Sequence, residues 1–269
     1  MEVSLMFYSI GDVSKILNVS KEMIRYYEKQ GALKPARKEN NNYRSYSTMD
    51  IFFLMEMIRY QALGLTTTEI NQLLNNNYMQ SYSDCLSNYH KKLEKEITFK
   101  LVLKDRIKEM ADRAKTSQLN INHYWFKNVD EHEYVFLCKG KDDCYGEIEL
   151  TKENRNIMFA GQNFTFFESM VIFNEEDENW VYAINTNYKE TLNIEMSDAI
   201  KQKSQLCICT MIDMSEVGCF NRKLLEPILK YIEEHQMTIV DKIRGIIICR
   251  GYQNNKYQRI MEIQIPIKP

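Results

Sequence analysis

Residues 8–46 constrain the fold of this chain more than any other stretch, because they place two short helices directly before a basic, tyrosine-rich hairpin. Ser9 precedes an apolar helical pattern and has Asp12 three residues on, which is the arrangement of an N-terminal capping box. Ser20 opens a second helix that runs to Glu28. Two short helices joined by a tight turn predict a helix-turn-helix.

The hairpin and two further helices complete this N-terminal region. Residues 40–42 are three consecutive asparagines, which tolerate the left-handed backbone of a hairpin tip. The tyrosines and Arg44 that follow are suited to sugar and phosphate contacts, which position a protein on DNA without reading bases. Ser47 and Thr66, each with an acidic residue three positions on, predict the starts of a third and a fourth helix.

Residues 8–74 resemble the winged helix-turn-helix domain of MerR-family transcription regulators. The resemblance rests on four blocks in the same order and spacing, residues 8–11 (YSIG), 24–28 (IRYYE), 43–46 (YRSY) and 63–65 (LGL).

This resemblance implies two sets of DNA contacts. The second helix would contribute Ser20, Lys21, Arg25 and Tyr26, and the wing would contribute Arg37, Tyr43, Arg44 and Tyr46. For Tyr46, the alternative is packing beneath the wing.

The net charge of −2 hides an uneven distribution along the chain. Residues 1–74 carry nine Lys/Arg against eight Asp/Glu, residues 75–116 carry nine against six, and residues 117–269 carry seventeen against twenty-three. Within residues 21–46 the count is seven against three. A local basic patch is the electrostatic footprint of nucleic-acid binding, so DNA contact is expected there and not in the acidic C-terminal part.

Residues 83–115 contain no Gly or Pro and predict one long helix. Its apolar side chains recur at intervals of three and four, at Leu86, Tyr89, Leu93, Ile97 and Leu101. A lone helix with one narrow apolar stripe buries that stripe by pairing with a second copy. The MerR resemblance implies the same, an antiparallel coiled coil that forms a homodimer. The alternative is packing on the chain's own C-terminal domain, for which Phe99, Val102 and Leu103 are candidates.

After residue 118 the pattern changes to short aromatic or β-branched segments that predict strands. The expected strands are residues 133–137, 157–160, 163–173, 180–185, 205–212, 244–249 and 257–267, with a helix over 224–235 and a shorter one over 198–203. The expected fold class is an all-α winged helix-turn-helix head (residues 1–76), a long dimerisation helix (77–118) and an α+β antiparallel-sheet effector-binding domain (119–269).

The part of the chain after residue 205 resembles the GyrI-like effector-binding domain that often accompanies MerR-type heads in multidrug-responsive regulators. The resemblance implies a lipophilic cation held by aromatic rings and a buried glutamate, the position of Glu262. A second acidic position of the family falls on Gly245, beside Arg244. An arginine facing the pocket would favour an anionic or neutral effector, and one facing outward would not affect the choice.

The predicted effector contacts are Phe159, Phe166, Trp180, Tyr182, Arg244, Tyr252, Tyr257 and Glu262. For each ring the alternative is an ordinary core or surface position.

Other classes of function find little support in the sequence. There is no apolar run of about 18 residues, as a membrane span requires. No Gly-rich phosphate loop, nucleophile elbow or HExxH motif occurs. The seven cysteines are scattered, and the pair Cys207 and Cys209 offers only two ligands for a metal. We therefore expect no catalysis, no cofactor and no metal site.

The sequence thus predicts a cytoplasmic, homodimeric, effector-responsive transcription regulator. Its expected partners are double-stranded promoter DNA, RNA polymerase at the promoter, and a small lipophilic effector whose charge the sequence leaves open; no membrane partner is expected. By the resemblance, the effector acts by bending and untwisting an overlong promoter spacer. The alternatives are a thiol- or metal-sensing MerR regulator, and a drug-sequestering or drug-modifying C-terminal module with an autoregulatory DNA-binding head.

Overall fold

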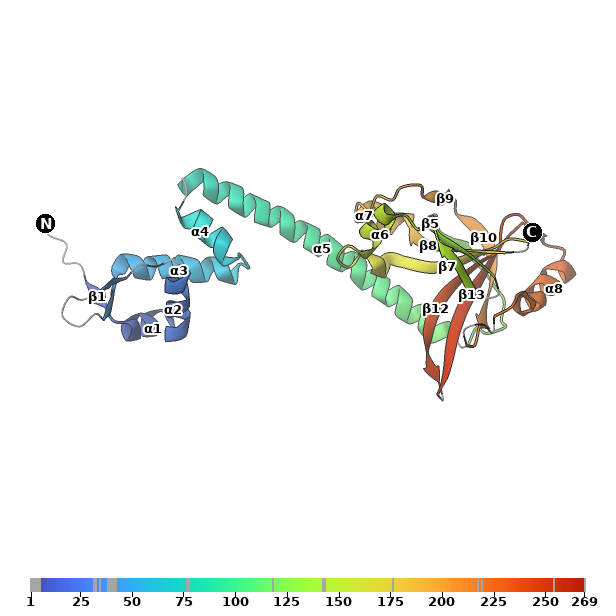
Figure 1. Ribbon diagram of the computed structural model, residues 1–269, viewed down its shortest axis with the longest axis horizontal. Coiled ribbons are helices and arrows are strands. Elements are labelled where there is room, and N and C mark those ends of the chain that lie inside the picture. Colours follow the sequence, from blue (N-terminus) through green and yellow to red (C-terminus); the bar gives the residue numbers. More distant parts are fainter. Residues whose placement is uncertain are drawn as a thin grey trace. The chain divides into compact units, whose positions relative to one another are not determined.

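The structure is a computed structural model. It describes residues 6–30, 33, 35–37, 43–75, 78–117, 119–141, 144–175, 177–216, 218, 220–253 and 255–268. Its contacts divide the chain into two units, Met1–Lys95 and Glu96–Pro269, whose elements are labelled in Figure 1. The hairpin tip predicted at residues 40–42 lies outside the described residues.

Short helices around a small sheet build the first unit. The helices are α1 (Ile10–Leu17), α2 (Lys21–Lys29), α3 (Thr48–Ala62) and α4 (Thr67–Asn75), and the sheet has the order β1 (Phe7–Tyr8), β3 (Arg44–Ser47), β2 (Ala36–Arg37). The hydroxyls of Ser9 and Ser47 each accept a 3.2 Å hydrogen bond from the backbone N–H three residues on. Ser20 and Thr66 cap α2 and α4 in the same manner. The predicted helix starts are confirmed.

The core of the first unit forms around Tyr27 of α2. This ring is fully buried together with Val13 and Ile24, as the apolar pattern of the first two helices requires. The Tyr27 hydroxyl donates to the side-chain oxygen of Gln61 on α3, so the buried ring keeps a hydrogen bond. Helix α3 ends just before Gly64, whose φ of 93° lies in the region that favours glycine.

The predicted long helix is confirmed as α5 (Tyr78–Ser117), a continuous helix of 40 residues (Figure 1). Tyr89 packs against the core of the first unit, whereas Phe99, Val102 and Leu103 pack against the core of the second. One face of α5 therefore packs on the chain's own C-terminal domain, as the alternative prediction stated. No helix of the described residues is both long and apolar enough to cross a membrane.

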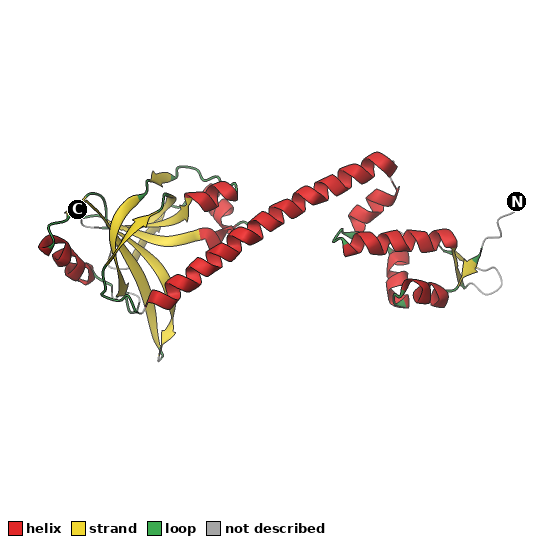
Figure 2. Ribbon diagram, turned by 180° about the vertical axis from the view of Figure 1, so that it is seen from behind, coloured by secondary structure: helices red, strands yellow, loops and turns green. Residues whose placement is uncertain are grey.

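One antiparallel sheet dominates the second unit (Figure 2). Its main path runs β4 (Trp125–Val129), β10 (Gln205–Asp213), β13 (Lys256–Lys268), β12 (Arg244–Gln253), β7 (Phe167–Phe173), β8 (Glu178–Asn185), β5 (His132–Lys141), β6 (Cys144–Ile148). Two short strands extend it, β9 (Ile200–Gln202) on β5 and β11 (Thr238–Ile239) on β13. The helical segments are α6 (Lys152–Phe159), η1 (Asn163–Phe166), α7 (Thr186–Thr191), η2 (Arg222–Leu225) and α8 (Glu226–Glu234).

The sheet consists of two halves with the same chain order. A strand, a helix and two strands follow one another as β5-α6-β7-β8 and again as β10-α8-β12-β13. In the sheet these halves read β5-β8-β7 and β10-β13-β12, and they join where β7 pairs with β12. The second unit is therefore built as a near-symmetric pair around the β7–β12 joint.

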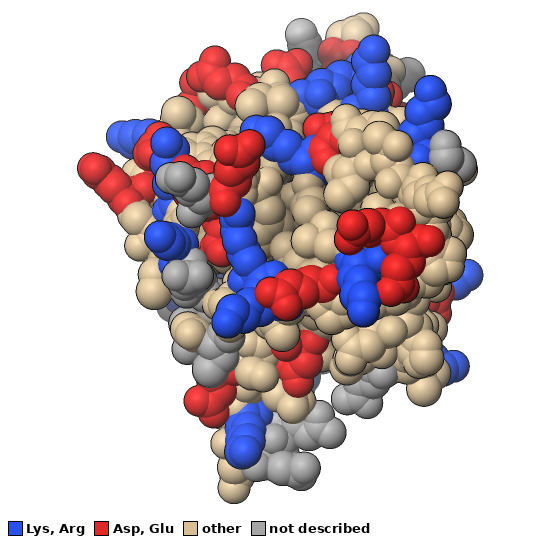
Figure 3. Space-filling view, turned by 90° about the vertical axis from the view of Figure 1, so that its right-hand side faces the viewer, with Lys and Arg blue, Asp and Glu red and all other residues tan. Residues whose placement is uncertain are grey.

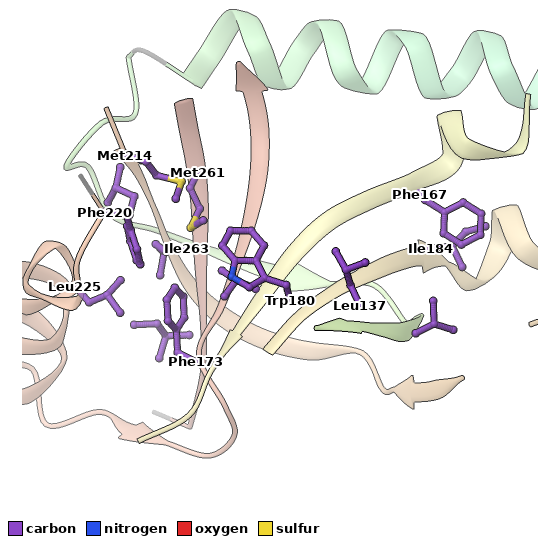
Figure 4. Close-up of a cluster of buried hydrophobic side chains, with 14 of the residues drawn as sticks. Leu137, Phe167, Phe173, Trp180, Ile184, Met214, Phe220, Leu225, Met261 and Ile263 are labelled. Carbon is purple, nitrogen blue, oxygen red and sulfur yellow. The ribbon is translucent and has the colours of Figure 1, made fainter. Parts of the chain in front are cut away.

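The two faces of the sheet have different surroundings. Strand side chains alternate between faces. On one face, Trp180, Phe173 and Ile263 belong to a large buried cluster, drawn in Figure 4, to which α6 and α8 contribute Met158 and Ile228. On the other face, a smaller cluster includes Met170, Ile172 and Ile246.

The predicted strands and helix of the C-terminal part are found, with three corrections. Residues 157–160 lie at the end of α6, because the hydroxyl of Thr151 caps a helix in which only one side is buried. The predicted strand 163–173 begins as the 3-10 helix η1, and β7 starts at Phe167. The short helix expected over 198–203 is instead strand β9, which pairs with β5.

Gly64→Ala is expected to destabilise the first unit. The added methyl group would overlap the Tyr89 hydroxyl, and alanine is strained at a φ of 93°. We expect a loss of roughly 1–3 kcal/mol, measured as faster hydrogen exchange of α3 and α4 amides in the full-length chain. Gly161→Ala is the matched control, because its φ of 55° is also positive but its Cβ would meet nothing within 4 Å. An effect at Gly64 no larger than at Gly161 would contradict the role of the Tyr89 contact.

Candidate ligand cavity and nucleic-acid interface

Helix α2 presents three of its predicted DNA contacts on the surface. Lys21, Arg25 and Tyr26 are exposed. The Arg25 guanidinium lies 3.6 Å from the Glu22 carboxylate one turn earlier, and an exposed pair of this kind contributes little, so phosphate or a base edge can replace it. The Ser20 hydroxyl is also exposed, but it accepts the capping hydrogen bond from Met23 N at 3.1 Å.

The wing strands carry the remaining predicted contacts, of which Arg37, Tyr43 and Arg44 are exposed. Arg44 Nε donates a 2.6 Å hydrogen bond to one oxygen of Glu28 on α2. The Tyr46 hydroxyl donates to the other Glu28 oxygen, and its ring is fully buried. The buried position of Tyr46 does not fit the predicted DNA contact. Tyr46 instead packs beneath the wing and fixes β3 to α2 through Glu28.

The apolar stripe of α5 is exposed over part of its predicted length. Ile97 is 57% exposed, Leu101 is 52% exposed, and Leu93 is exposed as well. Leu86 is half-buried, and Tyr89 is used in the core of the first unit. The exposed stripe is therefore formed by Leu93, Ile97 and Leu101, on the side of α5 opposite to the face that packs on the sheet.

A cavity of about 80 Å³ lies on the sheet face that α6 and α8 do not cover. Residues of α5 form one of its walls, and strands from both halves of the sheet form its floor. Its lining residues are Arg106, Glu109, Arg113, Lys127, Val129, Asp130, His132, Phe166, Glu168, Met170, Ala183, Ile184, Asn185, Tyr188, Ile246 and Gln264.

Ion pairs between α5 and the sheet dominate this cavity. Glu168 of β7 accepts hydrogen bonds from Arg106 Nη2 at 3.0 Å and from Arg113 Nη1 at 2.5 Å. Arg113 Nη2 also lies 3.5 Å from the Glu262 carboxylate on β13, and Lys127 Nζ lies 3.5 Å from the other Glu262 oxygen. The predicted effector residue Glu262 is only 2% exposed and is not among the residues that line the cavity. Because it is buried, these two cations compensate its charge.

The cluster holds Glu168 and Arg113 in their charged forms. Burial alone would raise the pKa of the Glu168 carboxyl, but the guanidinium groups of Arg113 and Arg106 outweigh it and hold that pKa below its usual value of 4.5. Burial would likewise lower the pKa of Arg113, but the carboxylates of Glu168 and Glu262 raise it. His132 in the cavity wall differs, because burial is the largest influence and lowers the pKa of its imidazole.

Arg244 faces the same side of the sheet as the cavity. It stands opposite Gln264 in β13 and opposite Ile172 in β7, and residues opposite one another share a face. Its side chain is buried, donates a 2.9 Å hydrogen bond to Gln205 Oε1, and lies 3.6 Å from Cys207 Sγ. Arg244 therefore points to the cavity side of the sheet, although it is not among the residues that line the cavity.

The acidic position predicted at Gly245 requires a correction. A Cβ at Gly245 would overlap the Met261 sulfur and lie 3.0 Å from Val171, both in the large core cluster on the opposite face. An acidic side chain at this position would enter the core and not the cavity. The carboxylate that pairs with Arg113 together with Glu262 is Glu168, on the neighbouring strand β7.

Among the six predicted rings, Phe166 lines the cavity and makes an edge-to-face contact with Phe99 of α5, with centroids 5.6 Å apart. Trp180 does not fit the prediction, because it stands opposite Val171 and points into the core beneath α6 and α8.

The other predicted rings lie elsewhere in the second unit. Phe159 and Tyr182 both contact Phe164, with centroids 4.5 and 5.4 Å apart. Tyr252 and Tyr257 pair with each other near the β12–β13 turn, where Tyr252 is 79% exposed. None of these four lines the cavity.

Several cavity residues were not predicted from the sequence. Glu168 is a lone carboxylate within an otherwise apolar strand, and that isolation was a usable signal. Arg106 and Arg113 are seven residues apart, which places both on one face of a helix. Lys127 and Tyr188 carry no comparable signal, since β4 and α7 were themselves not predicted.

The described cysteines are all free. Cys207 and Cys209 are fully buried on β10, and burial raises the pKa of both thiols, which disfavours the reactive thiolate. Over the described part of the chain, no three His, Cys, Asp or Glu side chains are grouped as metal binding requires.

Charges of both signs share the surface of the second unit. Figure 3 shows Lys and Arg beside Asp and Glu over the face that it displays. Exposed Lys201, for example, lies 2.7 Å from Glu131. A mixed surface of this kind attracts phosphate less than the basic segment of the first unit does.

Comparisons with known proteins identify the family. The model for the MerR HTH family of regulatory proteins matches residues 8–77. The HTH-type transcriptional regulator ZntR homolog of Haemophilus influenzae is 34% identical over 104 residues, which cover 39% of this chain and 68% of that protein. The chain belongs to the MerR family. For the HTH-type transcriptional regulator HmrR of Sinorhizobium medicae, the identity is 39% over 66 residues, which cover 24% of this chain and 45% of HmrR.

The chain thus spans about half the length of the curated MerR relatives it first matches. Similarity over nearly the full length is found to the Multidrug-efflux transporter 1 regulator of Bacillus subtilis, at 24% identity over 96% of this chain and 98% of that protein. The cryo-EM structure of the EcmrR–DNA complex covers 97% of this chain and 99% of that chain, with 19% identity and a TM-score of 0.41.

Glu168→Gln is expected to destabilise the second unit and to reduce its acid sensitivity. The folded-state pKa of Glu168 is depressed, so its contribution to stability is present above pH 4.5 and is lost as the pH falls through the lower folded value. We expect a loss of roughly 1–3 kcal/mol near neutral pH, measured from the melting temperature of the full-length chain.

The same melting experiment at about pH 4 separates the contribution of the Glu168 negative charge from other effects of the substitution on stability. Wild type should lose more of its stability between neutral pH and pH 4 than Glu168→Gln does. Glu147→Gln, at an exposed position of β6, is the control and should follow wild type. Identical pH dependence in all three proteins would mean that the Glu168 cluster does not contribute to stability.

Proposed function

We propose that this protein is an effector-responsive transcription regulator that binds promoter DNA as a homodimer in the cytoplasm. The observation that carries the proposal is the exposed basic and aromatic surface of the first unit, in a chain of the MerR family. In this proposal residues 1–76 form the DNA-binding head, residues 77–118 the dimerisation helix, and residues 119–269 the effector-binding domain.

The proposed DNA surface combines a helix with a wing. Lys21, Arg25 and Tyr26 project from α2, while Arg37 and Arg44 come from the wing strands. Glu28 joins the two parts through Arg44 and Tyr46, so the wing and the recognition helix meet DNA as one body. The helix would read bases in the major groove, and the wing would hold phosphates beside it.

The exposed stripe of Leu93, Ile97 and Leu101 supports the homodimer. An apolar row on a helix otherwise rich in charge is costly in water, and a second copy in antiparallel orientation would bury it. A twofold dimer would bind a near-palindromic operator.

The cavity supports small-molecule sensing. Its walls combine the Phe166 and Tyr188 rings with the Glu168 carboxylate of the ion cluster. The full-length similarity to a regulator named for multidrug efflux favours a lipophilic effector of the same broad kind. Effector binding would favour a dimer state that bends and untwists promoter DNA and so realigns the elements that RNA polymerase contacts. We propose regulation and not catalysis, because the relatives named above are regulators.

Arg25→Ala is expected to weaken binding to the chain's own upstream DNA by about 1–3 kcal/mol, the cost of losing one base contact in the major groove. The measurement is fluorescence anisotropy at fixed salt concentration. Arg59→Ala is the matched control, because Arg59 on α3 is also exposed and also pairs with a glutamate three residues earlier. Equal losses for both variants would remove Arg25 from the DNA-binding surface, and no salt-sensitive binding by wild type would overturn the proposed function.

Leu93→Glu combined with Ile97→Glu is expected to yield monomers, because carboxylates on facing stripes repel one another and expose the apolar row. Sedimentation velocity of the full-length chain measures the change. Lys91→Glu with Lys95→Glu alters the same turns of α5 on the opposite side and should leave the dimer intact. A persistent dimer in the stripe variant would place the interface elsewhere.

A further inference from the structure

We propose that the guanidinium of Arg113 is an internal occupant of the effector site, and that a ligand with a delocalised positive charge displaces it and releases the end of α5. This proposal rests on the effector-sensing function proposed above and assigns both a ligand class and a route of communication to the same site.

The position of Arg113 is the first support. Its two terminal nitrogens reach carboxylates from different halves of the sheet, with Nη1 2.5 Å from Glu168 on β7 and Nη2 3.5 Å from Glu262 on β13. Its Nε is buried and has no hydrogen-bond partner among the described residues. A side chain from α5 thus fills the place where the two acidic groups converge, without satisfying all of its own donors.

The size of the cavity is the second support. At about 80 Å³ it is smaller than the roughly 300–1,000 Å³ of sites that hold drug-sized ligands. A second cavity of about 330 Å³, lined in part by Met110 and Phe164, shares the Arg106, Arg113 and Glu168 side chains with the first. These three side chains therefore border both cavities, and withdrawal of Arg113 would enlarge the space that a ligand can occupy next to them.

Charge balance decides which ligand can replace Arg113. Without it, the cation that remains beside Glu262 among the described residues is Lys127 at 3.5 Å, although Gln264 Nε2 still donates a 2.7 Å hydrogen bond to Glu262. Glu168 keeps Arg106 at 3.0 Å, and the side chains of both carboxylates remain largely buried. A neutral or anionic ligand would leave this negative charge undercompensated, which is unfavourable in a buried site. A cation restores the balance, and a delocalised one loses little hydration and can also contact the Phe166 and Tyr188 rings.

Displacement of Arg113 would be transmitted to α5. The packing of Phe99 on Phe166 and the pairing of Arg106 with Glu168 hold the earlier turns of this helix on the sheet. Arg113 holds its last turns, so its release loosens residues 110–117 first. The stripe of Leu93, Ile97 and Leu101 lies on the same helix, which links ligand occupancy to the proposed dimer interface.

The test compares two probes of equal shape and opposite charge, tetraphenylphosphonium and tetraphenylborate, by calorimetry on the full-length chain. Arg113→Gln should bind tetraphenylphosphonium at least about tenfold more tightly than wild type, because the internal competitor is gone. Lys108→Gln removes an exposed charge from the other side of α5 and should bind like wild type. Glu168→Gln combined with Glu262→Gln should abolish binding of the cation.

Should Arg113→Gln fail to fold, Arg113→Lys provides the same comparison. This variant should show an intermediate gain in affinity for tetraphenylphosphonium, since a lysine ammonium cannot reach two carboxylates as a guanidinium does. In wild type, tetraphenylphosphonium should also speed hydrogen exchange at residues 110–117. Equal affinity for the cation in wild type, Lys108→Gln and the Arg113 variants would overturn the proposal. Tight tetraphenylborate binding that disappears in the Arg113 variants would overturn it as well, since the arginine would then bind the ligand.

Binding of upstream DNA by the same samples keeps the two proposals apart. Retained DNA binding with failure of the ligand test would refute the exchange of Arg113 alone. Loss of all specific DNA binding by wild type would refute the proposed function while leaving the ligand measurements interpretable.

Discussion

Glu168 and Glu262 are the two carboxylates for which the second unit must supply compensating positive charge. Each belongs to a different half of the sheet, each is mostly withdrawn from water, and neither is stable there without a positive charge nearby. The chain provides that charge from α5, so the requirement for compensation also fixes the position of the helix. The cavity, the docking of α5 and the charge of any ligand that enters all depend on this one pairing.

A single carboxylate has a comparable role in the first unit. Glu28 accepts from Arg44 and from Tyr46, which lie two residues apart on β3 and differ completely in exposure. The buried tyrosine anchors the wing, and the exposed arginine remains at the surface with a defined orientation. Strand β3 of the wing is in this way fixed to the same surface as α2.

Local signals in the sequence were sufficient for the first unit and for α5. The caps at Ser9, Ser20 and Ser47 define helix starts through hydrogen bonds between residues only three positions apart. These starts can therefore be predicted without knowledge of the tertiary fold. The exposed part of the α5 stripe, Leu93, Ile97 and Leu101, also follows from spacing, whereas Tyr89 of the same predicted stripe packs in the core of the first unit. In the second unit, the end of α6 was predicted as a strand. Ile157 and Met158 are adjacent apolar residues, and only the sheet beneath them determines that they are buried from a helix.

The candidate cavity was less accessible to sequence reasoning, because strand register determines which face a side chain occupies. Arg244 and Gly245 are neighbours, yet one faces the cavity side and the other the core. Glu168 joined the site only because β7 pairs with β12 at the centre of the sheet. The isolated carboxylate is visible in the sequence, but the sequence does not show which strands pair and therefore which residues Glu168 meets.

The joint between the halves of the sheet has a mechanical consequence. In the described chain, β7 and β12 share three register pairs, whereas β7 with β8 and β10 with β13 each share seven. Among the pairings that run from β10 to β5 in the described sheet, this joint is therefore the shortest, and residues of both of its strands line the cavity. A ligand bound in the cavity would lie over this short pairing. A small tilt of one half of the sheet against the other would then adapt the cavity to ligands of different size.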